Sequence, residues 1–398
     1  MSTQQLTIGI PKEIMVGEKR VAATPETVKK MVLDGAKVFV ENGAGQESFF
    51  TDDEYKNAGA ELVGDAEEIF AKSDLILKVK EPRFSDKKGK HEIDMMKEGQ
   101  ALLTFLHPAS PANHQMVRKL AAKGVVAISL DSIPRISRAQ TMDALTSMST
   151  IAGYKAVLMA ANILPAFMPM INTTIGTIQP ANVLVIGAGV AGLQSLATAK
   201  RLGTILYAAD VRPDACEQAM SLGAKIIDVQ VPAEIALEKN GYAKKLPEEW
   251  LVKEQQALGQ SINLANIVIL TALIPGKVAP ILVTEEMVKS MKTGSVIVDV
   301  AIDQGGNCEI TEAAKIVTKH GVNINGILNI PSMMPRSSTW MFANNVYNLV
   351  AYLVKNGKVI LNMDDEIIAS SLVTKDGRII HTGTLEAMNK NEKGAKNE

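Results

Sequence analysis

The chain has 398 residues, of which 46% are hydrophobic and 21% charged, so it can bury a large interior and is too long for one ordinary core. Its formal net charge of -1 gives no global field for nucleic acid or an anionic membrane surface, which excludes binding driven by overall basicity. The two cysteines, Cys216 and Cys308, form no motif and favour a reducing compartment without a disulfide framework.

Neither an export signal nor a membrane span is expected. The N-terminal stretch MSTQQLTIGIPKE lacks a basic region followed by an apolar run and a small-residue cleavage site. The most apolar stretch, residues 156–171, is interrupted by Asn162, Pro165 and Pro169, whereas a bilayer span needs about 20 mostly apolar residues. This stretch fits a buried helix better.

The first 130 residues alternate short apolar runs with helical patterns, and Gly, Pro or Asp marks each change. Strands separated by helices of this length build a parallel sheet flanked by helices. A second series of the same kind begins at ANVLVIG (181–187) and ends at INGILNI (324–330). The predicted fold class is therefore α/β, with two doubly wound, parallel-sheet domains.

Long helices are expected to link these domains, one over the apolar region 151–171 and one over 337–357. The predicted division is an N-terminal domain of residues 1–134 plus 330–382, and a nucleotide-binding domain of residues 135–329. The end of the chain, residues 383–398, is polar and charged, so it is predicted to be a disordered tail.

The most informative segment is VLVIGAGVAGLQ, in which an apolar strand runs into Gly187, Gly189 and Gly192. In a G-x-G-x-x-G turn the first glycine permits the tight turn and the second lets the backbone approach a pyrophosphate. The third lets the following helix pack closely, and the amino end of that helix then faces the phosphates. This context predicts a Rossmann-like dinucleotide site; the alternative is a glycine turn that binds nothing.

A second strand after this helix ends in Asp210, eighteen residues beyond Gly192. A carboxylate at this place accepts hydrogen bonds from a ribose 2′-hydroxyl and repels a 2′-phosphate, which favours NAD(H) over NADP(H). Arg212 complicates this choice, because an arginine near that position can hold a phosphate.

Several segments together resemble one family. They are PRISRAQTMDAL, STIAGYKAV, VLVIGAGVAGLQ, NGYAKKLPEEW, TALIPGKVAP and GGNCEIT. They are similar to the NAD(H)-binding component, domain I of the alpha subunit, of the proton-translocating NAD(P) transhydrogenase, which is itself related to alanine dehydrogenase. The resemblance extends from about residue 11 to about residue 380, and its RISRAQ and GYAK segments are specific to transhydrogenases.

The resemblance implies that Arg135, Gln140 and Asp143 surround the nicotinamide of NAD(H), with Thr146 where the family usually has serine. Arg135 and Asp143 would form a clasp on the carboxamide, and Gln140 would bridge toward a second nicotinamide. Hydride would pass directly between two rings about 3–3.5 Å apart, without an acid or a base. The alternative is that Ser137 and Asp143 begin helices and that the arginines are solvated.

The resemblance also implies a lid, in which Tyr242 beside Gly241 closes over the nucleotide and excludes water; the alternative is an ordinary surface loop. Leu273 falls at a strand's carboxyl end, where adenine usually lies. We predict Arg135, Gln140 and Asp143 as catalytic, and no metal site. The predicted cofactor-binding residues are Arg135, Ile136, Ser137, Arg138, Gln140, Asp143, Thr146, Gly187, Gly189, Val190, Gly192, Asp210, Val211, Arg212, Gly241, Tyr242, Glu254 and Leu273.

An alternative function is an alanine dehydrogenase-like oxidation of alanine to pyruvate. By resemblance to that enzyme, Arg20 and Lys78 would hold the keto acid, His107 would be the acid and base, and Asp303 would assist. The same four residues would have structural roles if the cleft no longer admits the acid. We prefer the transhydrogenase because alanine dehydrogenases lack RISRAQ and GYAK; a third alternative is a non-catalytic NAD-sensing module.

The resemblance further implies partners. NADP(H) would be bound by a partner subunit, and a membrane-spanning subunit would couple hydride transfer to proton movement. The component would be a homodimer whose seam lies on helix 340–354 or on segment 156–171, although both stripes are also typical of ordinary core. We expect a cytoplasmic protein held at the membrane by its partner subunits, without nucleic acid.

Overall fold

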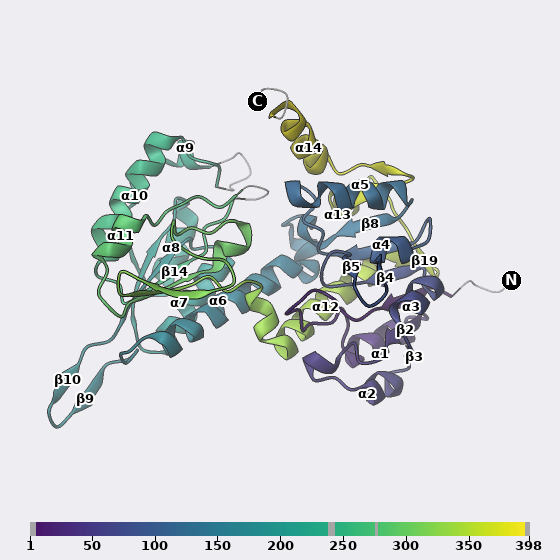
Figure 1. Ribbon diagram of the computed structural model, residues 1–398, viewed down its shortest axis with the longest axis horizontal. Coiled ribbons are helices and arrows are strands. Elements are labelled where there is room, and N and C mark those ends of the chain that lie inside the picture. Colours follow the sequence, from purple (N-terminus) through teal and green to yellow (C-terminus); the bar gives the residue numbers. More distant parts are fainter. Residues whose placement is uncertain (1–4, 238–242, 275–277, 395–398) are drawn as a thin grey trace. The chain divides into compact units, whose positions relative to one another are not determined.

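The computed structural model describes residues 5–237, 243–274 and 278–394 (Figure 1). It consists of two compact units, the first formed by Met1–Met148 with Ser332–Glu398 and the second by Ser149–Pro331. Residues 135–148, which we assigned to the nucleotide-binding domain, belong to the first unit instead. The reason is that this segment packs on a helix near the end of the chain, as described below.

The first unit is built on an eight-stranded sheet with the order β21-β20-β8-β7-β4-β1-β2-β3. Six strands are parallel and follow the 3-2-1-4-5-6 order of a doubly wound fold, while β20 and β21 continue the sheet in antiparallel fashion beside β8. The strands are β1 (Thr7–Ile10), β2 (Lys37–Glu41), β3 (Glu61–Val63), β4 (Leu75–Leu77), β7 (Ala101–Thr104), β8 (Val126–Ser129), β20 (Leu372–Lys375) and β21 (Arg378–Ile379).

Helices and two short hairpins complete this unit. Helix α1 begins where Thr24 caps it and Pro25 starts its first turn. Helix α1 spans Pro25–Leu33, and the other helices are α2 (Asp52–Asn57), α3 (Ala66–Lys72), α4 (Glu92–Met95), α5 (His114–Ala122), α12 (Pro335–Leu353), α13 (Glu366–Ser371) and α14 (Thr382–Gly394). The 3-10 turns are η1 (Gln46–Ser48), η2 (Pro111–Asn113), η3 (Leu130–Ser132) and η4 (Ser137–Met142), while η6 (Ile330–Met333) spans the boundary between the units. The hairpins pair β5 (Phe84–Ser85) with β6 (Lys90–His91) and β18 (Val354–Lys355) with β19 (Lys358–Val359).

Helix α14 corrects the expectation of a disordered tail over residues 383–394, and residues 395–398 lie outside the described residues. Its first turns carry Thr384 and Met388, which are buried, and Met388 packs into the core cluster that contains Met116 and Val373. These two anchors are spaced four residues apart and therefore lie on one face of the helix. A segment with few apolar residues is thus held by tertiary contacts that composition does not reveal.

The second unit has a seven-stranded sheet with the order β13-β12-β11-β14-β15-β17-β16. Its first six strands are again parallel in the 3-2-1-4-5-6 order, and β16 is antiparallel at the edge. The strands are β11 (Asn182–Ile186), β12 (Ile205–Ala209), β13 (Lys225–Ile226), β14 (Ile267–Leu270), β15 (Val296–Asp299), β16 (Ile316–Lys319) and β17 (Val322–Asn325). The predicted α/β class with two doubly wound parallel sheets is confirmed.

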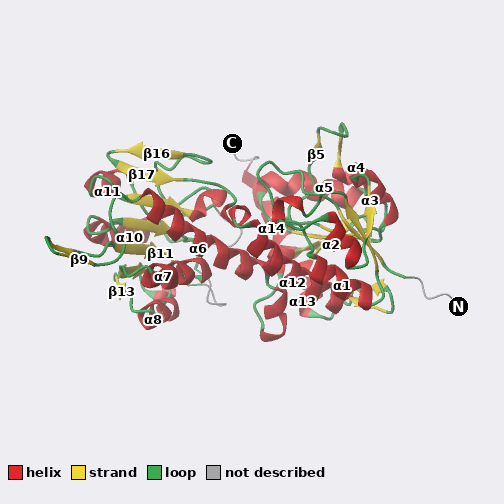
Figure 2. Cartoon of the chain, turned by 90° about the horizontal axis from the view of Figure 1, so that it is seen from below, coloured by secondary structure: helices red, strands yellow, loops and turns green. Residues whose placement is uncertain are grey.

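Side chains alternate across this second sheet, as a period of two requires. Val183 and Val185 belong to one core cluster, whereas Leu184 and Ile186 belong to another, so both faces are buried under helices (Figure 2). The helical elements of this unit are α7 (Val190–Arg201), α8 (Pro213–Ser221), α9 (Ala233–Ala236), α10 (Glu248–Ile262), α11 (Glu285–Ser290) and the turn η5 (Val300–Gln304). Helix α6 (Ala144–Ile163) begins in the first unit and ends in the second.

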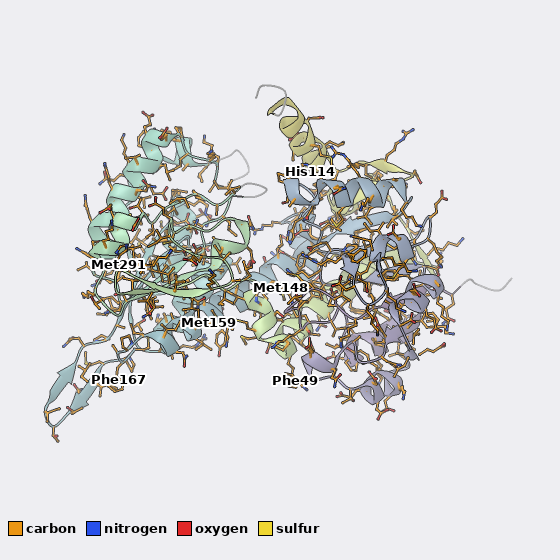
Figure 3. All side chains as sticks on the ribbon, in the orientation of Figure 1. Phe49, His114, Met148, Met159, Phe167 and Met291 are labelled. Carbon is orange, nitrogen blue, oxygen red and sulfur yellow. The ribbon has the colours of Figure 1, made fainter. Side chains whose placement is uncertain are left out.

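A hairpin of β9 (Ile171–Thr173) and β10 (Gly176–Ile178) extends away from the sheet of the second unit (Figure 1 and Figure 2). Phe167 lies at its base (Figure 3), and Ile175 at its tip is 97% exposed. We did not predict this hairpin, because INTTIGTI has no core-facing alternation. Among the helices that the structure describes, none is both long and apolar enough to cross a bilayer.

Candidate functional site

The glycine turn lies between β11 and α7, and two of its glycines are required by close backbone contacts. Gly187 has a φ of +90°, and a Cβ there would lie 2.8 Å from the backbone nitrogen of Ala272. A Cβ on Gly192 would lie 1.9 Å from the carbonyl oxygen of Gly187. Any side chain at either position would therefore force the turn open.

Gly189 has a different environment. The nearest atom to a Cβ built there is a guanidinium nitrogen of Arg212 at 3.6 Å, so the space in front of this backbone is open. Gly189 is also the N-cap of α7, and no side chain of the described residues caps that helix. The first amides of a helix attract anions, and an open approach beside them suits a pyrophosphate.

The turn also lies at the topological switch point of the sheet. After β11 the chain proceeds outward to β12 and β13, and it then returns to add β14 on the other side of β11. Ligands of doubly wound folds bind at the carboxyl ends of strands at such a reversal. Leu273, three residues beyond β14, is exposed at this end of the sheet.

Asp210 directly follows β12, and all of its acceptor positions are occupied. The carboxylate accepts hydrogen bonds from the backbone N–H of Ala188 (2.7 Å) and of Arg212 (2.8 Å). It also accepts two from the Arg212 side chain, with Nε at 2.9 Å and Nη2 at 2.8 Å. Asp210 therefore braces the glycine turn, and a ribose hydroxyl must displace part of the arginine contact to reach it.

Glu254 on α10 introduces a second acid near Asp210. Its side chain is buried, with 6% of the residue exposed. Burial, reinforced by the charge of Asp210, raises the pKa of Glu254 to about 7. Val190 and Val211 are half-buried beside these groups, while Gly241 and Tyr242 lie outside the described residues.

The RISRAQ segment lies in the first unit, after the carboxyl end of β8. Its Arg135, Ser137, Arg138 and Gln140 are exposed, and Ile136 is half-buried. The exposed side chains alternate with the buried Ala139 and Met142, which fix the turn η4 to its unit. This arrangement presents polar groups outward from a fixed backbone.

Asp143 and Thr146 contact each other at the start of α6. The Asp143 carboxylate accepts hydrogen bonds from the backbone N–H of Thr146 (2.9 Å) and from its hydroxyl (2.7 Å). This is the helix-start role that we considered as the alternative for Asp143, and a predicted clasp with Arg135 stays a prediction. Since the two helix contacts leave lone pairs on the carboxylate, the two roles are compatible.

The residues proposed for keto-acid chemistry have internal partners in this structure. Lys78 is 0% exposed, and its Nζ lies 3.3 Å from Oε2 of Glu13 and 2.9 Å from Oε1 of Glu92. Burial alone would lower the pKa of Lys78, but the two carboxylates raise it, so the amine stays charged. Lys78 thus completes a buried ion triad.

Arg20 is bound in the same way. Its Nε and Nη2 donate to the two carboxylate oxygens of Glu18, at 2.6 Å and 2.5 Å, and both residues are buried. In the second unit Asp303 accepts from the backbone N–H of Asn329, at 3.3 Å to each oxygen. The carboxylates of Glu13, Glu92 and Glu18 therefore fix the orientation of the Lys78 and Arg20 side chains.

His107 forms a dyad with Asp131. Its Nδ1 lies 2.7 Å from Oδ1 of Asp131, and the backbone N–H groups of Leu106 and His107 donate to the other oxygen. Burial alone would lower the pKa of His107, but the adjacent carboxylate raises it above its usual value. The ring stacks on Phe105.

Comparison with known proteins identifies the lineage. Residues 9–152 match the model of the alanine dehydrogenase/PNT N-terminal domain, and residues 156–382 match that of the C-terminal domain. The chain belongs to the alanine dehydrogenase/PNT family. The predicted resemblance is thereby confirmed.

Within the alanine dehydrogenase/PNT family, the chain is more similar to transhydrogenase subunits. It is 44% identical to the first part of the NAD(P) transhydrogenase subunit alpha of Rhodospirillum rubrum, over 94% of this chain and 98% of that protein. The crystal structure of transhydrogenase from Sinorhizobium meliloti matches with a TM-score of 0.80 and 37% identity, covering 94% of this chain and 99% of that one. An alanine dehydrogenase of Methanococcus maripaludis is 33% identical over 96% of each chain.

The predicted site residues of this family member fall into two groups. Residues from Arg135 to Thr146 belong to the first unit, and the described residues from Gly187 to Leu273 belong to the second; Gly241 and Tyr242 lie outside the described residues. Sequence reasoning missed the carboxylates at Glu13, Glu18 and Glu92. A signal existed for them, because buried cations require nearby counter-charges.

Proposed function

We propose that the chain is the NAD(H)-binding subunit of a proton-translocating NAD(P) transhydrogenase, an oxidoreductase that works together with partner subunits. Hydride passes directly between NADH on this chain and NADP+ on a partner subunit. The observation that carries the proposal is the 44% identity, along nearly the whole of both chains, to a transhydrogenase alpha subunit.

The second unit supports NAD(H) as the nucleotide. Its glycine turn leaves the backbone at Gly189 open, and the amino end of α7 offers amides to a pyrophosphate. Asp210 places a carboxylate at the ribose end, where a 2′-phosphate would be repelled. Arg212 opposes that repulsion, but its guanidinium is already bound to Asp210.

The first unit supports direct transfer. Bound NADH supplies the hydride. Arg135 and Gln140 present exposed donors and acceptors from a fixed turn, and Asp143 orients the start of α6 beside them. These residues would hold the carboxamide and align the ring, so the rate depends on approach and alignment rather than on proton transfer.

The alanine dehydrogenase alternative lacks comparable support. Lys78 and Arg20, which would hold a keto acid, are buried and oriented by Glu13, Glu92 and Glu18. Admitting a substrate carboxylate would require breaking these buried ion pairs, at a cost of several kcal/mol each. We expect no pyruvate- and ammonia-dependent oxidation of NADH by the purified chain.

We further propose that the subunit is a homodimer in the cytoplasm, held at the membrane by its partner subunits. On helix α12 most of the apolar stripe we considered as a seam is buried, including Phe342, Val346 and Leu349, although Trp340 at its start is 54% exposed. The hairpin β9–β10 is a better candidate, because an isolated two-stranded hairpin is marginally stable without further packing. If the hairpin forms the dimer interface, Ile175→Asp at the exposed tip of the hairpin should shift the protein from dimer to monomer in light scattering.

A reconstitution experiment tests the function. The purified chain is mixed with an NADP(H)-binding partner subunit of a transhydrogenase, and reduction of NADP+ by NADH is followed. We expect exchange only with the partner present, and no loss of it in His107→Ala. Oxidation of NADH with pyruvate and ammonia that disappears in His107→Ala would overturn the proposal, and NADH binding without either reaction would favour a sensor.

A further inference from the structure

Helix α12 carries a row of polar side chains that contact the RISRAQ turn. The row consists of Asn345, Asn348 and Tyr352, which are spaced by three and four residues and therefore share one face of the helix. All of their contacts with the turn lie within the first unit. Most apolar residues of α12, among them Phe342, Val346 and Leu349, are buried, and the polar row lies beside them.

Two of these side chains bind one carbonyl group. The side-chain amide of Asn345 donates to the backbone oxygen of Thr141 at 2.8 Å, and that of Asn348 donates to the same oxygen at 3.1 Å. A carbonyl oxygen has two lone pairs, and both are used here. Asn345 is only 8% exposed, so its hydrogen bond is shielded from competing water.

The third side chain holds the turn at Arg138. Nη1 of Arg138 donates to the hydroxyl oxygen of Tyr352 (2.7 Å) and to Oδ2 of Asp365 (2.8 Å). The Tyr352 hydroxyl donates to the same oxygen of Asp365 at 2.5 Å. Hydrogen bonds from Tyr352 and Arg138 lower the pKa of Asp365 to about 2, so this anchor stays ionised across the physiological range.

These anchors lie on both sides of Gln140, at Arg138 and at Thr141. The backbone of η4 is thereby fixed where the exposed side chains of Arg135 and Gln140 depart from it. We propose that Asn345, Asn348, Tyr352 and Asp365 are positioning residues for hydride transfer, and that Arg138 is their anchor point rather than a ligand of the nucleotide.

This inference rests on the proposed function and changes the role that we predicted for Arg138. Displacing a catalytic group by about 1 Å can slow a reaction strongly while binding is preserved. Loosening η4 should therefore lower the turnover number for hydride transfer far more than the affinity for NADH. If the network were merely structural, loosening it would lower the free energy of unfolding without lowering the turnover number more than the affinity for NADH.

Tyr352→Phe is the decisive variant, because it removes one hydroxyl and keeps the ring. Tyr347→Phe is its matched control, since Tyr347 lies on the same helix and its hydroxyl donates to Asp34 at 2.9 Å, away from η4. With the partner subunit present, we expect Tyr352→Phe to lower kcat about fivefold, the equivalent of one hydrogen bond, with an unchanged Kd for NADH. Tyr347→Phe should leave both values at those of the wild type.

A double-mutant cycle tests the anchor. Tyr352→Phe should cause little further loss of kcat in an Arg138→Gln background, because the two changes break the same contact. Additive losses, or an Arg138→Gln loss that appears in the Kd for NADH, would overturn the assignment. A Tyr352→Phe protein with wild-type kcat would do the same.

Amide hydrogen exchange separates this proposal from the proposed function. If wild type and partner exchange no hydride, the function is wrong, but residues 137–142 should still exchange faster in Tyr352→Phe than in Tyr347→Phe. Equal exchange in the two variants would refute positioning independently of any activity.

Discussion

The buried acid on α10 gives a prediction that depends on structure alone. Burial raises the pKa of Glu254 from 4.5 to about 7, so the folded protein binds this proton more tightly than the unfolded chain does. The stability contributed by protonated Glu254 is fully present below about pH 4.5 and is lost as the pH rises through 7. A displacement of about 2.5 pH units, at about 1.4 kcal/mol per unit, amounts to about 3.5 kcal/mol.

Glu254→Gln removes this pH dependence, because the amide stays neutral. Relative to the wild type, we expect the variant to gain about 2.5 kcal/mol in free energy of unfolding between pH 5 and pH 8. Urea unfolding without nucleotide measures the difference. The chain has two tryptophans, Trp250 on α10 and Trp340 on α12, so a Trp340→Phe background makes fluorescence report on the second unit alone.

The control is Glu249→Gln, which removes an exposed carboxylate from the same helix. It should leave the difference between pH 5 and pH 8 as in the wild type. If Glu254→Gln changed the free energy of unfolding equally at pH 5 and pH 8, burial would not raise the pKa of Glu254, and the reasoning would be refuted.

Three further predictions test the ion triad, the glycine turn and the nucleotide preference. Lys78→Met leaves Glu13 and Glu92 buried without a cation, and should lower the free energy of unfolding by about 3–5 kcal/mol in urea titrations followed at Trp340. Gly192→Ala should lower both the melting temperature and the affinity for NADH, because the new Cβ would lie 1.9 Å from the Gly187 carbonyl oxygen. Gly189→Ala should lower only the affinity for NADH, because the nearest atom to its Cβ is 3.6 Å away. Normal NADH binding by Gly189→Ala would show that the pyrophosphate binds elsewhere. Arg212→Gln removes the cation beside Asp210, so NADPH affinity should fall about tenfold more than NADH affinity in fluorescence titrations, and a parallel fall would refute repulsion as the source of preference.

The parts of this protein that sequence predicts well are those coded by neighbouring residues. The strand β11 and the glycines after it lie within one short segment, and both the alternation of Val183 with Leu184 and the close contact at Gly192 follow from local geometry. The same holds for the two series of strands and helices, which predicted the α/β class.

The parts that sequence does not predict depend on residues far apart in the chain. Arg138 is predicted from the local sequence to bind the nucleotide, and its contacts with Tyr352 and Asp365, more than two hundred residues later, are visible only in the structure. Helix α14 is similar, because its composition is polar and its order comes from burying Met388 against distant residues. In both cases the local sequence does not reveal the tertiary contact.

The two doubly wound sheets differ in how well they suit a nucleotide. Both place a reversal of strand order beside their first strand. In the second unit the chain leaves that strand through Gly187 and Gly189, so backbone amides face open space. In the first unit Glu13 occupies the same edge, bound to Lys78 and to the backbone N–H of Val79 at 2.6 Å. A pyrophosphate there would meet a buried carboxylate instead of amides, which agrees with the proposed function, in which the first unit contributes the polar turn and not the nucleotide's phosphate site.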